Sequence, residues 1–211
     1  MKKIAFSDRY GLTQAVIEGR KTMTRRIIPC IENDLILCGR VKLPIKGFEH
    51  GVLFMDTSSI LPDCYSSSAP SKYQPRYEIG EVVSVAQRYK DAINPLDWVN
   101  ITIFKNSPGW TNKMFTCADL MPHQIRITDI KLERLQDISD EDCMKEGIME
   151  GEFMNTWDTF YFDQWGDVAN HITFQTPRKA FAALIDSISG RGTWECNPYT
   201  YAYSFELVKK E

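Results

Sequence analysis

The chain has 211 residues, of which 43% are hydrophobic, and it carries a net charge of −3. This length and composition suffice for one domain with a real core and require no second domain. The small negative charge argues against broad, sequence-independent binding of nucleic acid, for which a basic domain is typical, but leaves room for a local basic patch.

The cysteines and histidines show no metal-binding pattern. The six cysteines contain no Cys-x-x-Cys pair, and the three histidines are scattered, so we expect reduced thiols and no metal. A glycine-rich loop that could hold a phosphate is also missing, and we predict no cofactor. Neither a signal peptide nor an apolar run of ~18 residues is present, which predicts a soluble, cytoplasmic protein without membrane contact.

The N-terminal segment combines a strand, a helix and a basic run. Residues 1–6 have the pattern of a short strand, and residues 9–18 that of a helix capped by Ser7 or Asp8. Gly19 stands where a glycine commonly ends a helix. The basic segment that follows contains Arg20, Lys21, Thr22, Thr24, Arg25 and Arg26.

Such a run of charges is usually a solvated surface, but its position after a helix end favours a second interpretation. A turn after Gly19 would bring Lys21 and Thr24 together, whereas a regular strand would point them to opposite faces. A lysine desolvated among arginines would have a lowered pKa and could take the proton of the Thr24 hydroxyl. The same cations could equally hold a phosphate backbone.

Further elements follow from hydrophobic periodicity and turn residues. The segments with a strand pattern are 35–37, 52–55, 125–132 and 199–207, the first two being a possible hairpin around Gly47, and 77–85 is a turn followed by a β-rich run. The segments with a helical pattern are 139–147 and 177–190. Residues 57–75 and 91–124 are expected to be irregular, and the aromatic residues of the second stretch either cover the core or stack on a base.

The segment from Val16 to Arg26 resembles the signature of the ASCH domain family, Gly-x-Lys-x-x-(Glu/Thr)-x-Arg. Gly19, Lys21, Thr24 and Arg26 fill that pattern. This resemblance implies an α+β fold, a PUA-like mixed β-barrel of about five to seven strands flanked by a few helices, with loop and hairpin insertions.

Weaker similarity to longer ASCH-like proteins of phages and prophages covers 77–85, 125–148 and 177–208. The chain departs from those proteins at Ala86-Gln87, where they have Arg-Glu. We expect a single domain over residues 1–211, with insertions around 31–75 and 149–175.

One bacterial branch of the family hydrolyses acetylated cytidine to cytidine with a Lys, a Thr and a Glu. The resemblance transfers these roles to Lys21, Thr24 and Glu146. A glutamate in the last turn of a helix is disfavoured by the helix dipole, so Glu146 would gain by facing Lys21 or Arg26, although a plain surface position is the alternative.

These observations lead to an amidohydrolase hypothesis and to alternatives. One alternative is a non-catalytic module that binds a nucleoside, a nucleotide or single-stranded RNA, and another is a phage or prophage accessory protein. The sequence identifies no protein partner. The candidate binding residues are Arg20, Arg25, Arg26, Arg126, Trp194 and Asn197, of which the last two also fit packing and turn roles.

Overall fold

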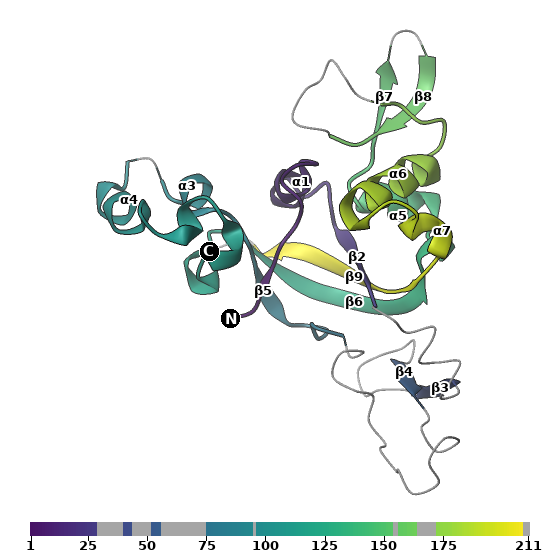
Figure 1. Ribbon diagram of the computed structural model, residues 1–211, viewed down its shortest axis with the longest axis horizontal. Coiled ribbons are helices and arrows are strands. Elements are labelled where there is room, and N and C mark those ends of the chain that lie inside the picture. The colour runs from purple at the N-terminus through teal and green to yellow at the C-terminus, as the bar shows by residue number, and fades with distance from the viewer. Residues whose placement is uncertain are drawn as a thin grey trace, which may run out of the picture.

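The computed structural model describes residues 1–28, 75–94, 96–151, 159–163 and 172–208, together with the backbone of 40–43, 52–55, 152–153 and 156–158. Within these residues, five strands form one mixed sheet in the order β1-β5-β6-β9-β2 (Figure 1). The strands are β1 (Lys3–Ile4), β2 (Met23–Ile27), β5 (Val82–Val85), β6 (Gln124–Arg134) and β9 (Tyr199–Val208). Strand β1 is parallel to β5, and the other pairs are antiparallel. The predicted α+β class is therefore confirmed.

The two long strands β6 and β9 form the centre of the sheet. Their ladder contains a register shift between Ile127 and Asp129, where a β-bulge bends the pair. Alternate side chains of both strands face the core, as the sequence pattern of each predicts. The buried members are Ile125, Ile127, Ile130, Tyr201, Tyr203 and Phe205.

Helices cover the sheet in two groups. They are α1 (Leu12–Ile17), α3 (Tyr89–Ala92), α4 (Trp98–Phe104), α5 (Asp140–Lys145), α6 (Pro177–Ser189) and α7 (Thr193–Cys196). Figure 1 shows α5, α6 and α7 packed together on one side, while α3 and α4 project from the other side as an arm. Helix α6 starts with Pro177 after the Thr176 cap, as predicted, and buries Phe181, Leu184 and Ile185.

Four short 3-10 turns and two hairpins complete the described chain. The turns are η2 (Pro108–Trp110), η3 (Lys113–Phe115), η4 (Ala118–Leu120) and η5 (Leu135–Asp137). The hairpins pair β3 (Arg40–Leu43) with β4 (Val52–Met55) and β7 (Met149–Phe153) with β8 (Thr156–Tyr161). The strand prediction for 52–55 is confirmed, whereas 35–37 lies outside the described residues.

The sheet formed by the described residues is open, so the predicted PUA-like β-barrel is not confirmed. Strands β1 and β2 are its two edges, and no ladder joins them in the described part of the chain. Strand β1 has only two residues, and both pair with β5. Instead, the Arg26 guanidinium donates to the Ala5 carbonyl at 2.7 Å across this gap.

Two element predictions were wrong in detail. Helix α1 begins three residues later than predicted because Gly11, at φ +61°, makes a turn before it, and the Asp8 carboxylate accepts from Thr13 instead of capping the helix. Helix α4 lies in a stretch predicted to be irregular from its turn residues, and the Asp97 side chain caps its start by accepting from the Asn100 amide. No helix in the described part of the chain has the length and apolarity needed to cross a membrane.

The cysteines of the described residues differ sharply in their surroundings. Cys143 of α5 is fully buried, and this burial raises the pKa of its thiol to about 12. Cys117 and Cys196 are exposed. Because the thiolate is the reactive form, iodoacetamide at about pH 8 should label Cys117 and Cys196 in the folded protein and leave Cys143 unmodified.

Peptide mapping by mass spectrometry measures this difference. Labelling repeated in urea is the control, and there Cys143 should react like the other two. Equal labelling of Cys143 in the folded protein would contradict the packing of α5 described above.

Candidate functional site

The basic segment lies against the end of α5. Gly19, at φ +76°, ends α1, and the Lys21 N–H then donates to the Ala15 carbonyl at 2.9 Å. The next amide, of Thr22, donates to the Lys145 carbonyl at 2.9 Å. This turn places Lys21 just before β2. Lys21 therefore does not follow the alternation of side chains along the strand, which would point Lys21 and Thr24 to opposite faces.

Lys21 and Glu146 form a buried ion pair. The Lys21 ammonium donates to Glu146 Oε2 and to the Glu146 carbonyl, both at 2.6 Å. The two residues are only 2% and 4% exposed. Glu146 is the C-cap of α5, and the buried ammonium beside it offsets the unfavourable end of the helix dipole.

Arg25 extends this pair into a network. Its guanidinium donates to Glu146 Oε1 at 3.1 Å and, through Nε and Nη2, to Glu133 Oε1 at 2.9 and 2.5 Å. Asp142 Oδ2 lies 3.5 Å from Nη2. Two cations thus meet three carboxylates, and the network ties β2 to β6 and to α5.

A cavity of about 180 Å³ lies beside the network. Its polar wall consists of Lys21, Thr24, Arg25, Arg26 and Glu146. Its apolar wall comes mainly from α6 and from the segment after β1, with Phe6, Leu12, Ile27, Phe181, Leu184, Ile185 and Ile188. We call this space the lysine cavity.

Thr24 lines the lysine cavity, and its hydroxyl has no hydrogen-bond partner among the described residues. Thr24 lies on β2, pairs with Tyr203 of β9 in the sheet and is 5% exposed. Among the described residues, no hydrogen bond of its side chain is found, whereas the neighbouring Lys21 and Arg25 are bonded. A buried polar group of this kind is normally satisfied, so a bound molecule or water is the natural acceptor or donor.

Burial controls the charge of Lys21. Desolvation lowers the pKa of its ammonium, the Glu146 carboxylate opposes this shift, and the nearby charges of Arg26 and Arg25 lower the pKa further. The net direction is downward from the ordinary value of 10.5. The neutral amine is therefore reached more readily than in a solvent-exposed lysine.

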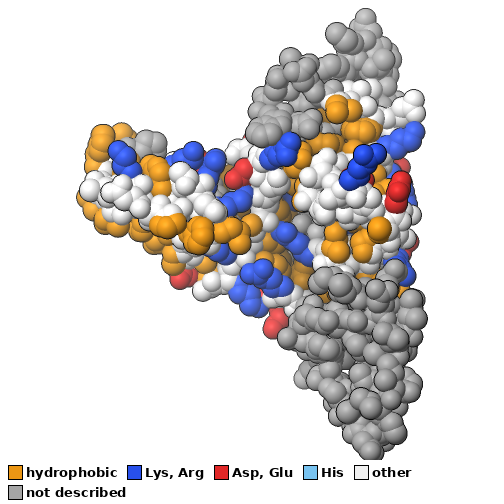
Figure 2. Space-filling view, viewed as in Figure 1, with side chains coloured by type: hydrophobic (Ala, Val, Ile, Leu, Met, Phe, Trp, Pro, Cys, Tyr) orange, Lys and Arg blue, Asp and Glu red, His pale blue; other side chains and the backbone are white. Residues whose placement is uncertain are grey.

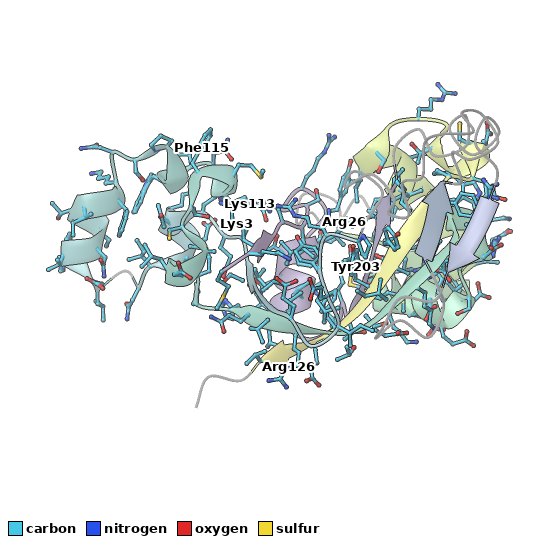
Figure 3. All side chains as sticks on the ribbon, turned by 90° about the horizontal axis from the view of Figure 1, so that it is seen from below. Lys3, Arg26, Lys113, Phe115, Arg126 and Tyr203 are labelled. Atoms are coloured by element: carbon cyan, nitrogen blue, oxygen red, sulfur yellow. The ribbon has the colours of Figure 1, made fainter. Side chains whose placement is uncertain are left out.

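The other candidate residues are divided between the cavity and the surface. Arg25 and Arg26 line the lysine cavity. Arg20 is exposed, pairs with Glu18 at 2.5 Å and does not line the cavity. Arg126 is exposed on β6 and pairs with Glu206 at 3.3 Å, and Figure 3 shows it far from Arg26.

Trp194 and Asn197 stabilise the turn around α7 and do not line the lysine cavity. Trp194 packs edge-on against Phe181, with ring centroids 6.1 Å apart. Asn197 adopts a left-handed conformation at φ 45°, and its side-chain oxygen accepts from the Gln136 amide at 2.8 Å. These are the packing and turn roles that the sequence also allowed.

Sequence reasoning missed the partners of Arg25 and the apolar wall. Glu133 stands at the end of a strand pattern and Asp142 in the first turn of a helix, so each had an ordinary local explanation. The helical periodicity of Phe181 and Leu184 predicted that they are buried, but not that they line a cavity. Gln87, at the departure from the family pattern, hydrogen-bonds to His123 at 2.8 Å and lines a different cavity.

Compared with models of known protein families, with curated proteins and with solved structures, the chain gives no match. The resemblance to ASCH domains therefore rests on the motif residues alone, and membership of that family stays a prediction.

The ion-pair network should make a large contribution to stability. Glu146→Gln is expected to lower the free energy of unfolding by about 3–5 kcal/mol, because the Lys21 ammonium stays buried without its carboxylate. Adding Lys21→Met should recover part of this loss, since it removes the unpaired charge. Urea denaturation measures both changes.

Glu206→Gln is the matched control, because it removes a carboxylate from an exposed pair with Arg126. Its effect should stay within about 0.5 kcal/mol. Equal effects of Glu146→Gln and Glu206→Gln on the free energy of unfolding would contradict the large contribution predicted for the buried pair.

Proposed function

We propose that the protein is an amidohydrolase that removes a small acyl group from the exocyclic amine of a cytosine nucleoside or nucleotide. The observation that carries this proposal is the unpartnered Thr24 hydroxyl in the same cavity wall as the buried Lys21–Glu146 pair. The resemblance to ASCH domains supports it, because that resemblance assigns the roles of the family's catalytic Lys, Thr and Glu to Lys21, Thr24 and Glu146. With the family we also propose a PUA-like architecture, and its support is the α+β class with a mixed five-stranded sheet.

In the proposed reaction, neutral Lys21 takes the proton of Thr24, and the Thr24 oxygen attacks the acyl carbon. Arg26, on the same wall, stabilises the negative oxygen of the tetrahedral intermediate. The carbon–nitrogen bond then breaks, and Lys21 passes its proton to the departing amine. Water, deprotonated by Lys21, attacks the acyl-Thr24 ester, and the proton returns to the Thr24 oxygen as the carboxylic acid leaves.

Glu146 acts in this scheme by positioning Lys21. It accepts two of the three ammonium hydrogens, through its side chain and its carbonyl, and so fixes the amine at the cavity wall. No hydrogen bond joins Lys21 to Thr24 among the described residues. The scheme therefore requires the Thr24 side chain to rotate toward Lys21 when substrate binds. Catalytic hydrogen bonds are commonly long before substrate binds, so this requirement is ordinary.

The size of the lysine cavity limits what can enter it. A volume of about 180 Å³ is below the range of about 300–1,000 Å³ that is typical of ligand pockets. The cavity therefore suits the acyl group and part of a base, while the sugar stays outside.

Binding of single-stranded RNA without turnover is the second candidate. It is supported by the exposed rings of Trp98 and Phe115 on the arm, which are 73% and 64% exposed. Such rings offer stacking surfaces for unpaired bases.

The first test of the hydrolase proposal is turnover of acetylated cytidine, followed by chromatography of cytidine. Thr24→Val keeps the shape of the side chain and removes the nucleophile, so it should lower kcat/KM by about 10²–10⁴-fold. Thr128→Val, at an exposed threonine of β6, is the matched control and should leave the rate unchanged. Full activity of Thr24→Val, or no turnover by the unmodified protein, would refute the proposal.

The rate should also depend on pH through Lys21. Since the active form is the neutral amine, kcat/KM should rise with pH and reach a plateau, with an inflection below 10.5 because the Lys21 pKa is lowered. Stopped assays across the alkaline range, with circular dichroism at each pH to verify folding, measure this profile. A rate that falls as pH rises above neutrality would contradict the role of Lys21 as the base.

A further inference from the structure

A second cavity shares a wall with the lysine cavity. It has a volume of about 350 Å³, and we call it the arginine pocket. Arg26 and Ala5 line both spaces, and a hydrogen bond of 2.7 Å joins the Arg26 guanidinium to the Ala5 carbonyl. The lining residues of the arginine pocket are Lys3, Ala5, Arg26, Arg76, Tyr77, Met114 and Tyr203. Figure 3 shows Lys3, Arg26 and Tyr203 on the same side of the sheet.

The arginine pocket has three cations in its lining and no carboxylate. This differs from the lysine cavity, where carboxylates match the charge of Lys21 and Arg25. Figure 2 shows Lys and Arg side chains gathered in the middle of the molecule, between the arm and the layer that contains α6.

The three cations of the arginine pocket form no ion pair with any described residue. Arg26 uses one nitrogen, Nη2, for the Ala5 carbonyl, and Arg76 forms no ion pair with a described residue. The Lys3 ammonium donates to the carbonyls of residues 113, 114 and 116, which are neutral acceptors. Lys3 therefore contributes a positive electrostatic potential to the pocket. The two guanidinium groups retain N–H donors that no described residue accepts.

Two buried tyrosines give the arginine pocket fixed walls. The rings of Tyr77 and Tyr203 meet edge-on, with centroids 5.4 Å apart. The Tyr77 hydroxyl donates to the Lys3 carbonyl at 3.0 Å, and the Tyr203 hydroxyl accepts from the Arg76 amide at 2.9 Å. The backbone that carries Arg76 is thus held in place before any ligand binds.

We infer that the arginine pocket binds the phosphate of a cytidine nucleotide whose acylated base occupies the lysine cavity. This inference rests on the proposed function and names its substrate class as phosphorylated. Guanidinium groups match the geometry of phosphate oxygens through paired hydrogen bonds. Arg26, between the two spaces, would hold the substrate at the junction of base and sugar-phosphate.

The same chemistry fits two sources of phosphate. One is the terminal group of a mononucleotide, and the other is an internal phosphodiester of an RNA strand. The arginine pocket and the lysine cavity are each too small for a long segment, so one nucleotide unit is the recognised element in both cases.

The experiment compares the binding of cytidine and of cytidine monophosphate by isothermal titration calorimetry. The monophosphate should bind at least about tenfold more tightly, and this advantage should shrink as salt is added. Arg76→Gln should reduce the affinity for the monophosphate to that for cytidine and leave cytidine binding unchanged. The affinity of Arg76→Lys for the monophosphate should lie between those of the unmodified protein and Arg76→Gln, since lysine keeps the charge and loses the paired donors.

Arg191→Gln is the matched control, because Arg191 is exposed, follows the end of α6 and belongs to neither lining set. Equal affinities for cytidine and its monophosphate, or an unchanged affinity in Arg76→Gln, would overturn the inference. A cytidine trinucleotide that binds more tightly than the monophosphate would identify RNA as the source, and the reverse order a free nucleotide.

The binding assay contains no acyl group and needs no turnover. If acetylated cytidine is not hydrolysed but Arg76→Gln still loses the phosphate advantage, the arginine pocket stands and the hydrolase proposal fails. If hydrolysis occurs and the phosphate gives no advantage, only the arginine pocket is refuted.

Discussion

The buried contact between Lys21 and Glu146 is the constraint on which the arrangement of the site depends. Removing an ammonium and a carboxylate from water costs several kcal/mol each, and only close pairing with further hydrogen bonds offsets this cost. Here the pairing distance is 2.6 Å, and Arg25 satisfies the second carboxylate oxygen. The contact can form only when the α1–β2 turn and the end of α5, which are 125 residues apart, are both in place. The buried charges therefore specify how the turn between α1 and β2 packs against the end of α5.

The open edge of the sheet explains why two cavities lie side by side. If β1 and β2 were paired, a ladder would satisfy the backbone between them and fill the space with strand. Because β1 is short, the Ala5 carbonyl is left for a side chain, and Arg26 supplies the donor. The Arg26 side chain then lines both the lysine cavity and the arginine pocket.

The sequence was informative where local patterns decide the structure. The alternation of β6 and β9 and the capped start of α6 follow from side-chain periodicity and cap chemistry, and all three are as predicted. The turn at Gly19 similarly indicated that Lys21 and Thr24 would share a wall.

Features that depend on distant contacts were not accessible in the same way. The start of α1 depends on a left-handed Gly11, and the openness of the sheet depends on the length of β1. Arg126 looked equivalent to Arg26 in type and strand position, yet the two lie far apart (Figure 3). The arginine pocket combines residues near positions 3, 26, 76 and 203, and no local pattern links them.

Thr24 distinguishes a chemical role of the site from a purely structural one. The ion-pair network alone would be satisfied with a valine at position 24, since no described residue bonds to the threonine hydroxyl. An unsatisfied buried hydroxyl costs about 1–3 kcal/mol, and valine has nearly the same shape without that cost. If Thr24 had only a structural role, Thr24→Val would stabilise the protein. If Thr24 is the nucleophile, valine cannot replace it. Thr24 also lines the cavity beside an amine whose pKa is lowered by burial, which is the setting that activates a weak nucleophile.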